Sequence, residues 1–147
     1  MLDGDFEIRD RLDESQTAQL MDLYAGEWWT AGRSLPDVRA MLANSDLVFA
    51  LVHRPTDRLV GFARVLTDYI YTAVVLDVIV AEHLRGTGLG ATLMDAIVEH
   101  PRLASVRTIE LTCQPELVAF YERWGFTEKV GRSRLMRRTS DPRLTSG

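Results

Sequence analysis

The stretch that decides the fold is Thr72–Val80, TAVVLDVIV, followed closely by Arg85–Gly90, RGTGLG. The first segment is the most apolar run of the chain and is rich in β-branched residues, which is typical of a central strand covered on both faces. After the glycines, Leu89, Leu93 and Ile97 recur at helical spacing. The order strand, glycine-rich turn and helix predicts backbone amides and a helix N-terminus at one place, where a phosphate group can bind.

Asp77 is the single charge inside this apolar run. Burying a carboxylate without a partner is costly, so we expect Asp77 to emerge at a local distortion such as a β-bulge, or to meet a polar partner. Two interpretations stay open at this point. Asp77 is either an acid beside the reacting groups or a structural acid that bonds a neighbouring loop.

The glycine-rich turn does not fit the common nucleotide-binding motifs. RGTGLG lacks the G-K-[ST] ending of a nucleoside-triphosphate loop, and it lacks the G-x-G-x-x-G spacing of a dinucleotide site. The turn therefore predicts phosphate binding without indicating either of these two cofactor classes.

Segments on both sides of the central run alternate between strand and helix signals, which favours a single α/β layer structure. Helices are expected from near Ser15 through Trp28 and, after a capping signal at Ser34, toward Asn44. The other expected strands are Phe6–Asp10, Leu47–His53, Leu59–Thr67, Thr108–Cys113, residues 126–130 and residues 133–138.

Length and composition predict one soluble domain. The chain has 147 residues, of which 46% are apolar and 26% charged, and these values are near globular averages. No apolar run approaches the ~20 residues that span a bilayer, and the acidic start MLDGDFEIRD does not resemble a signal peptide. The single cysteine, Cys113, suits a reducing compartment. We expect a cytoplasmic protein with one domain over residues 1–147, a core over about 6–138 and a tail over 139–147.

The charge pattern argues against several partners. The net charge is −4, and no basic stripe carries interleaved aromatic residues, so nucleic acid is not an expected partner. His53, His83 and His100 show no ligand spacing, so no metal site is expected. Residues 129–143 are rich in arginine, which fits either a solvated tail or attraction of an anionic ligand. We expect a monomer or a homodimer with no membrane contact.

Two motifs in the same order resemble a known family. Arg85, Gly88 and Gly90 match the pattern [R/Q]-x-x-G-x-[G/A], and Phe120–Phe126, FYERWGF, matches F-Y-x-x-x-G-F. Together they resemble the GNAT superfamily of acyl-CoA-dependent N-acetyltransferases, over nearly the whole chain from Phe6 to Arg138. The resemblance implies a mixed, mostly antiparallel sheet of about six to seven strands with helices on both faces.

The resemblance also implies acetyl-CoA as co-substrate and assigns residues that bind it. A backbone N–H of the strand that carries the pantetheine contacts would polarise the acyl carbonyl. Gln114 stands where relatives have an asparagine that bonds the pantetheine, and an ordinary role at a strand end is equally open. The implied pyrophosphate residues are Arg85, Gly86, Thr87, Gly88, Leu89, Gly90 and Ala91, and the implied pantetheine residues are Val78, Ile79 and Val80.

Tyr121 is the candidate general acid, because the tyrosine of this signature lies near the coenzyme sulfur in the family and protonates the departing thiolate. Helical periodicity offers a competing interpretation. Leu117, Phe120, Tyr121 and Trp124 form one stripe, which is typical of core residues. A covalent route through Cys113 is less favoured, since no histidine lies close to it in the sequence.

The acceptor side is the least specific part of the sequence. Asp77 lies where some polyamine-acetylating relatives have the second acid of an L-E-D-L-x-V strand, but Leu76 replaces the first acid, which argues against polyamines. We expect Asp77 to attract an ammonium group and relay its proton to water. Of the two adjacent tryptophans, one is expected to anchor the core and one to line a pocket. The other candidate acceptor-binding residues are Glu27, Trp28, Trp29, Asp68 and Tyr69.

The predicted reaction is direct transfer of an acetyl group to a primary amine of a small molecule within a ternary complex. Three alternatives remain open: a protein or peptide amine as acceptor, a longer acyl-CoA as donor, and a non-catalytic acyl-CoA-binding module.

Overall fold

The computed structural model describes residues 4–145, which divide into two compact units, one up to Thr112 and one from Cys113 onward. Within the described residues the first unit holds a five-stranded sheet and the three longest helices. The single domain expected from the sequence stays a prediction. No helix among residues 4–145 has the length and apolar character needed to cross a bilayer.

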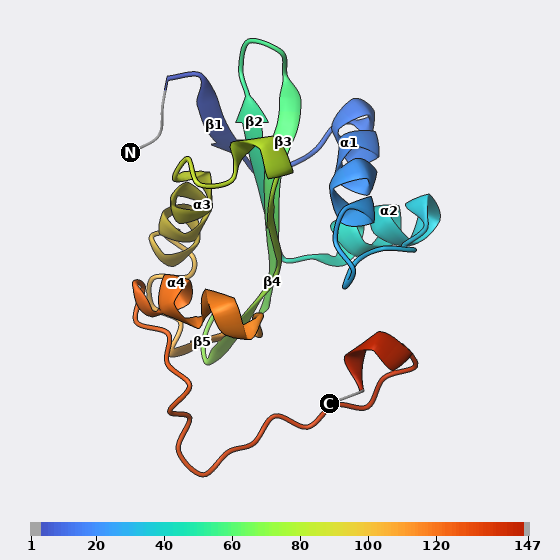
Figure 1. Cartoon of the computed structure of the whole chain (residues 1–147). Coiled ribbons are helices and arrows are strands. Elements are labelled where there is room, and N and C mark those ends of the chain that lie inside the picture. Colours follow the sequence, from blue (N-terminus) through green and yellow to red (C-terminus); the bar gives the residue numbers. More distant parts are fainter. Residues whose placement is uncertain (1–3, 146–147) are drawn as a thin grey trace. The chain divides into compact units, whose positions relative to one another are not determined.

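The sheet has the strand order β1-β2-β3-β4-β5 (Figure 1). Strands β1 to β4 pair antiparallel in sequence order, whereas β5 pairs parallel with β4. The mixed, mostly antiparallel sheet is therefore confirmed. The bounds are β1 Phe6–Arg9, β2 Leu47–His53, β3 Arg58–Thr67, β4 Thr72–Val80 and β5 Thr108–Glu110.

The expected sixth and seventh strands, residues 126–130 and 133–138, are not strands in the described chain. Neither segment carries a continuous apolar face, which a strand needs to stay paired over a core. In the first, Glu128 lies between Phe126 and Val130 on the same face. In the second, Leu135 and Met136 are adjacent, so they would point to opposite faces. The sheet has five strands where about six to seven were expected.

Helices cover both faces of the sheet (Figure 1): α1 (Glu14–Ala25) and α2 (Leu35–Asn44) lie on one side, and α3 (Leu89–Val98) lies on the other. Asp13 and Gln16 form a reciprocal capping box at the start of α1. The first helix was expected to reach Trp28, but it ends at Ala25, because Gly26 caps it.

The core follows from these two layers. Leu93, Met94 and Ile97 of α3 are fully buried, and α3 contacts β2, β3 and β4. Burial of such side chains is worth about 1.5–3 kcal/mol each, which fixes α3 and the turn before it against the sheet. On the α1 and α2 side, the core cluster consists of Leu20, Tyr24, Val38, Ala50, Val52, Leu59, Phe62 and Ile79.

A β-bulge interrupts the pairing of β3 with β4. Phe62 lies opposite Ile79 and Arg64 lies opposite Leu76, so one residue of β3 faces two residues of β4. Asp77 sits in this bulge with φ +56°, in the left-handed region that non-glycine residues rarely adopt. The local distortion expected at Asp77 is confirmed.

The pairing of β4 with β5 is short and leaves one edge of β4 open. It covers only Thr72 to Val74, so the later residues of β4 have no partner on that side within the described chain. The N–H of Ala81, directly after β4, donates to the carbonyl of Val60 in β3 at 2.8 Å. Since backbone groups alternate in direction along a strand, Ile79 also faces β3, and Val78 and Val80 face the open edge.

Candidate functional site

The turn before α3 leaves the N-terminus of this helix without a side-chain cap. Gly86 and Gly88 have φ values of +80° and +90°, and Gly88 is the N-cap of α3 with no side-chain cap. A Cβ on either glycine would meet no heavy atom within 4 Å, so the space over the turn is open. The first N–H groups of a helix, here those of Leu89–Ala91, have no intrahelical acceptor. This arrangement fits the predicted binding of a pyrophosphate.

Arg85 and Thr87, also expected at the pyrophosphate, already have partners. The Thr87 hydroxyl donates to the carbonyl of Leu84, and Arg85 Nε donates to the carbonyl of Val80 at 3.2 Å. The guanidinium of Arg85 forms an ion pair with the carboxylate of Glu27. The structure thus joins a predicted acceptor residue to a predicted coenzyme residue.

The three residues expected at the pantetheine differ in whether their backbone faces the open edge of β4. Val78 and Val80 direct their backbone groups toward the edge that β5 leaves open. Ile79 faces β3 with its backbone, and its side chain belongs to the buried core cluster. Of these three residues, Val78 and Val80 are therefore the ones placed to hydrogen-bond a ligand through their backbone, and the carbonyl of Val80 already accepts from Arg85.

Asp77 is buried, with 9% of its surface exposed, and three side chains donate hydrogen bonds to it. Its Oδ2 accepts from the Tyr24 hydroxyl at 2.9 Å, from Arg33 Nη1 at 2.7 Å and from Arg64 Nε at 2.8 Å. Its Oδ1 accepts from Arg33 Nη2 at 3.3 Å. We call these four residues the Asp77 cluster.

The electrostatics of the Asp77 cluster keep the carboxylate charged. Burial alone would raise the pKa of Asp77, but the hydrogen bonds from Arg33 and Arg64 outweigh it and hold this pKa below its usual range. Burial and the neighbouring Asp77 carboxylate raise the pKa of Tyr24 well above its usual value, so this hydroxyl stays neutral and donates. A carboxylate with three donors and a lowered pKa is a weak base. These contacts favour the structural interpretation of Asp77 over the expected role in relaying a proton.

Glu27, Trp28 and Trp29 lie in the segment between α1 and α2, which also carries Arg33. Trp29 packs against the core cluster, whereas Trp28 is 49% exposed. One tryptophan anchoring the core was expected, and Trp29 does so. The segment also reaches both the turn before α3, through Glu27, and the bulge in β4, through Arg33.

Asp68 and Tyr69 lie far from the end of β4 where the other predicted site residues meet. The Asp68 carboxylate accepts the N–H groups of Ile70, Tyr71 and Thr72, and these backbone hydrogen bonds lower its pKa. This holds the turn between β3 and β4, at the start of β4. Val80 lies at the other end of that strand, roughly 26 Å away at ~3.3 Å per residue. The contacts of Asp68 are those of a turn acid.

In the second unit, Tyr121 lies on the short helix α4 (Val118–Glu122), with 7% of its surface exposed. Its ring contacts Phe120 and Phe126, with ring centroids 5.0 Å and 6.3 Å away. Burial, with a smaller contribution from Cys113, raises its pKa to about 12. Among the described residues of this unit the hydroxyl has no hydrogen-bond partner. A neutral hydroxyl in a buried ring is compatible with both interpretations, the general acid and the core residue.

Gln114 and Cys113 precede α4. Gln114 is half-buried, and its backbone carbonyl accepts from the N–H of Leu117 at 2.9 Å, which begins the 3-10 helix Pro115–Leu117. Burial raises the pKa of the Cys113 thiol, as do the nearby carboxylates of Glu128 and Glu116. A raised thiol pKa disfavours the thiolate and therefore a covalent route.

Sequence reasoning missed three members of the Asp77 cluster: Tyr24, Arg33 and Arg64. A signal for Arg64 was present, because it is the only charge inside the apolar stretch Leu59–Thr67. Two adjacent antiparallel strands, each apolar with one charge of opposite sign, predict a buried ion pair between them.

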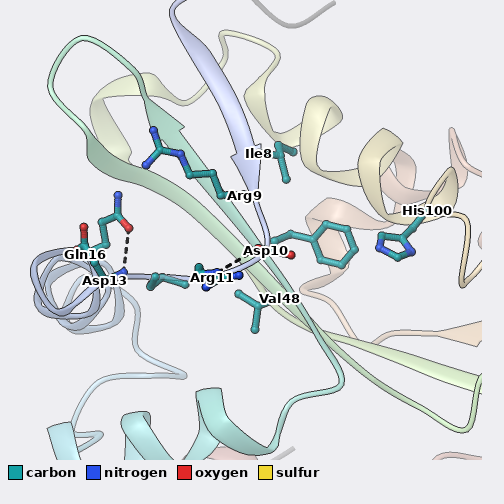
Figure 2. Close-up of a pocket in the computed structure, with 10 residues that line it drawn as sticks. Ile8, Arg9, Asp10, Arg11, Asp13, Gln16, Val48 and His100 are labelled. Atoms are coloured by element: carbon teal, nitrogen blue, oxygen red, sulfur yellow. Dashed lines mark hydrogen bonds and ion pairs between the residues drawn. The ribbon is translucent and has the colours of Figure 1, made fainter.

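A separate hollow of about 670 Å³ lies beside β1, at the sheet edge opposite β5 (Figure 2). It includes His100, whose ring stacks edge-on against Phe49. None of the residues predicted for the site lines it. The lining residues are Ile8, Arg9, Asp10, Arg11, Leu12, Asp13, Gln16, Val48, Phe49 and His100.

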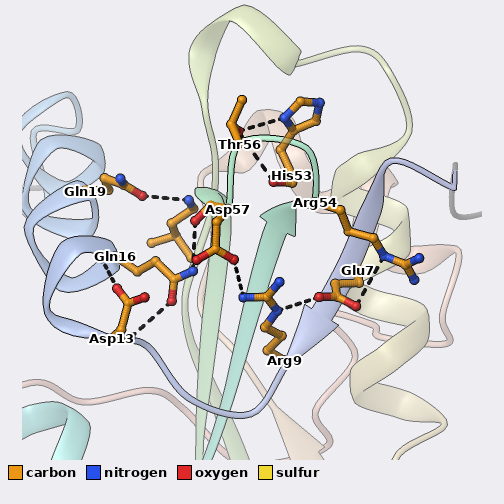
Figure 3. Close-up of polar contacts among 10 residues, drawn as sticks. Glu7, Arg9, Asp13, Gln16, Gln19, His53, Arg54, Thr56 and Asp57 are labelled. Carbon is orange, nitrogen blue, oxygen red and sulfur yellow. Dashed lines mark hydrogen bonds and ion pairs between the residues drawn. The ribbon is translucent and has the colours of Figure 1, made fainter.

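Polar groups next to this hollow bind one another (Figure 3). Arg9 bonds Glu7 at 2.5 Å and Asp57 at 2.6 Å, and Gln16 donates to the carbonyl of Asp57 at 2.9 Å. The contacts tie the hairpin between β2 and β3 to the start of α1, which is a structural role. Across the part of the chain that the structure describes, no group of three His, Cys, Asp or Glu side chains could hold a metal ion.

Comparisons with known proteins agree with this architecture. Residues 31–138 match the family model described as an acetyltransferase (GNAT) domain. A solved structure from Xanthomonas campestris pv. campestris, described as an acetyltransferase of the GNAT family, is 30% identical, has a TM-score of 0.80 and aligns over 97% of each chain.

Curated relatives carry N-acetyltransferase names. The uncharacterized N-acetyltransferase ycf52 of Pyropia yezoensis is 33% identical over 96 residues, which are 64% of this chain and 55% of the relative. Serotonin N-acetyltransferase 2, chloroplastic, of Oryza sativa subsp. japonica is 41% identical over 69 residues, 47% of this chain and 34% of the relative. The chain spans about half the length of the first curated relatives it matches. The family model, the aligned structure and the geometry of the strand-to-helix junction agree, and the chain belongs to the GNAT superfamily of N-acetyltransferases.

Proposed function

We propose that this chain transfers an acetyl group from acetyl-CoA to a primary amine of a small molecule. One observation carries the proposal: the open edge of β4 at Val78 and Val80 is followed, after the 3-10 helix Glu82–Leu84, by a turn whose glycines leave the N-terminus of α3 uncovered. An extended amide-containing arm can pair with the strand edge while its pyrophosphate meets the helix N-terminus. Acetyl-CoA has both parts in this order.

The proposed chemistry is direct transfer. The neutral amine nitrogen attacks the thioester carbon, the C–N bond forms, and the C–S bond breaks. The nitrogen loses one proton to water, and the departing thiolate gains one. A backbone N–H at Val78 or Val80 is aimed away from β3 and can stabilise the oxyanion of the intermediate. Tyr121 is the proposed acid of the final step, because its hydroxyl is neutral and can donate a proton to the leaving thiolate, although burial raises its pKa to about 12 and so makes it a weaker acid.

The acceptor amine must first lose a proton. With a pKa near ~10.4, roughly one amine in 2,500 is uncharged at pH 7, a deficit worth about 4.6 kcal/mol. The Asp77 carboxylate is occupied by two guanidinium groups and one hydroxyl, so water is the proposed carrier of this proton. The rate should therefore rise with pH over the range in which the amine deprotonates.

The test is thiol release from acetyl-CoA with a panel of small primary amines, followed by mass spectrometry of the product. We expect release that depends on both acetyl-CoA and the amine, with a mass gain of one acetyl group on the amine. Binding of acetyl-CoA without thiol release for any amine would contradict the proposal and favour a binding module. Acetylated protein with no acetylated small molecule would point to a protein acceptor.

A further inference from the structure

The Asp77 cluster carries more positive than negative charge. Arg33 and Arg64 both bond the one carboxylate of Asp77, and within the described residues neither forms an ion pair with a second acid. Tyr24 is neutral, so the cluster has a net charge of +1. A buried ion pair is usually balanced, because uncompensated charge away from water is costly. Solvent balances part of this excess at the partly exposed Arg33 and Arg64, and an anionic ligand would balance the rest.

Arg64 also has unused hydrogen-bond donors. It bonds Asp77 through Nε alone, and its two Nη groups have no partner among the described residues. Only 15% of its side chain is exposed, yet no fully buried side-chain nitrogen or oxygen in the described chain lacks a partner, so the Nη groups still reach solvent. A guanidinium presents its donors in a planar fork that matches a carboxylate or a phosphate.

The contacts of Arg33 add a second cation at the same carboxylate. Its Nη1 and Nη2 bond the two oxygens of Asp77, and its side chain is 30% exposed. Asp77 thus holds two guanidinium groups side by side and keeps them oriented. One acid between two arginines orients them without cancelling their charge.

The position of the cluster indicates which substrate carries the anion. Asp77 directly precedes Val78, where the proposed thioester arm begins, and Arg33 shares its segment with Glu27, Trp28 and Trp29. The phosphate-binding turn lies beyond the other end of this arm, after Val80. An anion at the Asp77 cluster therefore belongs to the acceptor rather than to the coenzyme.

From these observations we propose that Arg33 and Arg64 bind an anionic group, a carboxylate or a phosphate, that the amine acceptor carries. The inference rests on the proposed acetyl transfer and adds the chemical class of the acceptor. Asp77 is the positioning residue of this site, since it fixes the two guanidinium groups.

The experiment compares amines that differ only in an anionic group. One pair is serotonin and 5-hydroxytryptophan, which adds a carboxylate, and the other is glucosamine and glucosamine 6-phosphate, which adds a phosphate. We expect kcat/KM for thiol release to be at least about tenfold higher for the anionic member of one pair, and the responding pair identifies the anion. Equal or faster reaction of both uncharged members would overturn the inference.

Variants of Arg64 separate binding from structure. In Arg64→Gln the ratio of kcat/KM between the anionic and the uncharged member should fall toward one, mainly because KM for the anionic member rises. Arg64→Lys should restore part of this ratio. If Arg64 had a purely structural role, its loss would lower kcat/KM equally for both members of a pair. An unchanged ratio would therefore overturn the inference. Arg39→Gln is the matched control, because it removes an arginine of α2 that pairs with Glu14 on the surface, and it should keep the wild-type ratio.

Asp77→Asn provides an opposite prediction. Asparagine keeps one side-chain oxygen that can accept from the guanidinium groups but removes the negative charge, so the preference for the anionic member should rise, whereas an acid that attracts ammonium would make KM rise for every amine. Calorimetry with CoA present separates this inference from the proposed function. Binding of the anionic member that is lost in Arg64→Gln would support the site even if no amine were acetylated, and equal binding by both proteins would overturn it.

Discussion

Gly88→Ala tests the proposed pyrophosphate site most directly. Gly88 has φ +90°, and a Cβ there would meet no heavy atom within 4 Å, so the variant suffers backbone strain without a steric clash in the free protein. Left-handed backbone costs an L residue about 1–2 kcal/mol. For a chain of this length that cost lowers Tm by about 2–8 °C. Folding should therefore survive.

Gly32→Ala is the matched control, because Gly32 has φ +91° and equally open space around its Cβ position. Both variants should lose the same amount of stability. Only the methyl group at Gly88 occupies the space proposed for the pyrophosphate, where it also keeps phosphate oxygens away from the first N–H groups of α3. Loss of one charge-assisted hydrogen bond, about 1.5–3 kcal/mol, raises Kd by roughly tenfold or more.

The assay is calorimetric titration of each protein with CoA, alongside thermal unfolding. Binding of CoA is measured in place of turnover, because Gly32 precedes Arg33, a proposed acceptor-binding residue. A change at Gly32 could therefore alter turnover without affecting CoA. We expect Gly32→Ala to bind CoA with wild-type affinity and Gly88→Ala to bind at least about tenfold more weakly. Equal affinity in the two variants would refute the placement of the pyrophosphate at this turn.

Three further predictions concern single side chains. Tyr121→Phe keeps the buried ring, so kcat should fall by roughly 10²-fold with little change in Tm; lower Tm with normal turnover would instead identify a core residue. Glu27→Gln removes the acid that pairs with Arg85, so CoA should bind several-fold more tightly in calorimetry at low salt, and weaker binding would contradict a competing ion pair. The lowered pKa of Asp77 stabilises the fold above its unfolded pKa of about 3.9, and this contribution is lost as pH falls through the lower folded pKa. The stability difference between wild type and Asp77→Asn in urea, of order 3 kcal/mol at pH 7, should therefore shrink below about pH 4, and a constant difference would contradict the argument.

Local signals explain which elements could be predicted from the sequence. The strands Leu47–His53 and Thr72–Val80 have the expected bounds, because each is a largely apolar run rich in residues that favour strands. Helix α2 begins at the expected cap, Ser34, and ends at Asn44. Where the end of an element depends on a single glycine, as at Gly26, apolar spacing alone extended the helix too far.

In the candidate site, too, the parts set by local sequence could be predicted, and the parts set by strand pairing could not. The turn Arg85–Gly90 is contiguous in sequence, so its glycines and the following helix could be located without any structure. Ile79 was expected to face the coenzyme with its neighbours, but the alternation of backbone groups along β4 assigns it to β3. That assignment depends on which strand pairs with which edge, and sequence alone does not give it.

The environment of Asp77 shows where sequence reasoning stops. The cost of an unpaired buried charge predicts that partners exist, and the bulge was expected on the same ground. This cost does not predict how many partners there are, because Arg33 and Arg64 lie 44 and 13 residues from Asp77 in the sequence. One arginine would give a neutral structural pair, whereas two give a cationic site with free donors. The proposed preference for anionic acceptors thus depends on the second arginine, which only the packing of the α1–α2 segment over β3 and β4 could reveal.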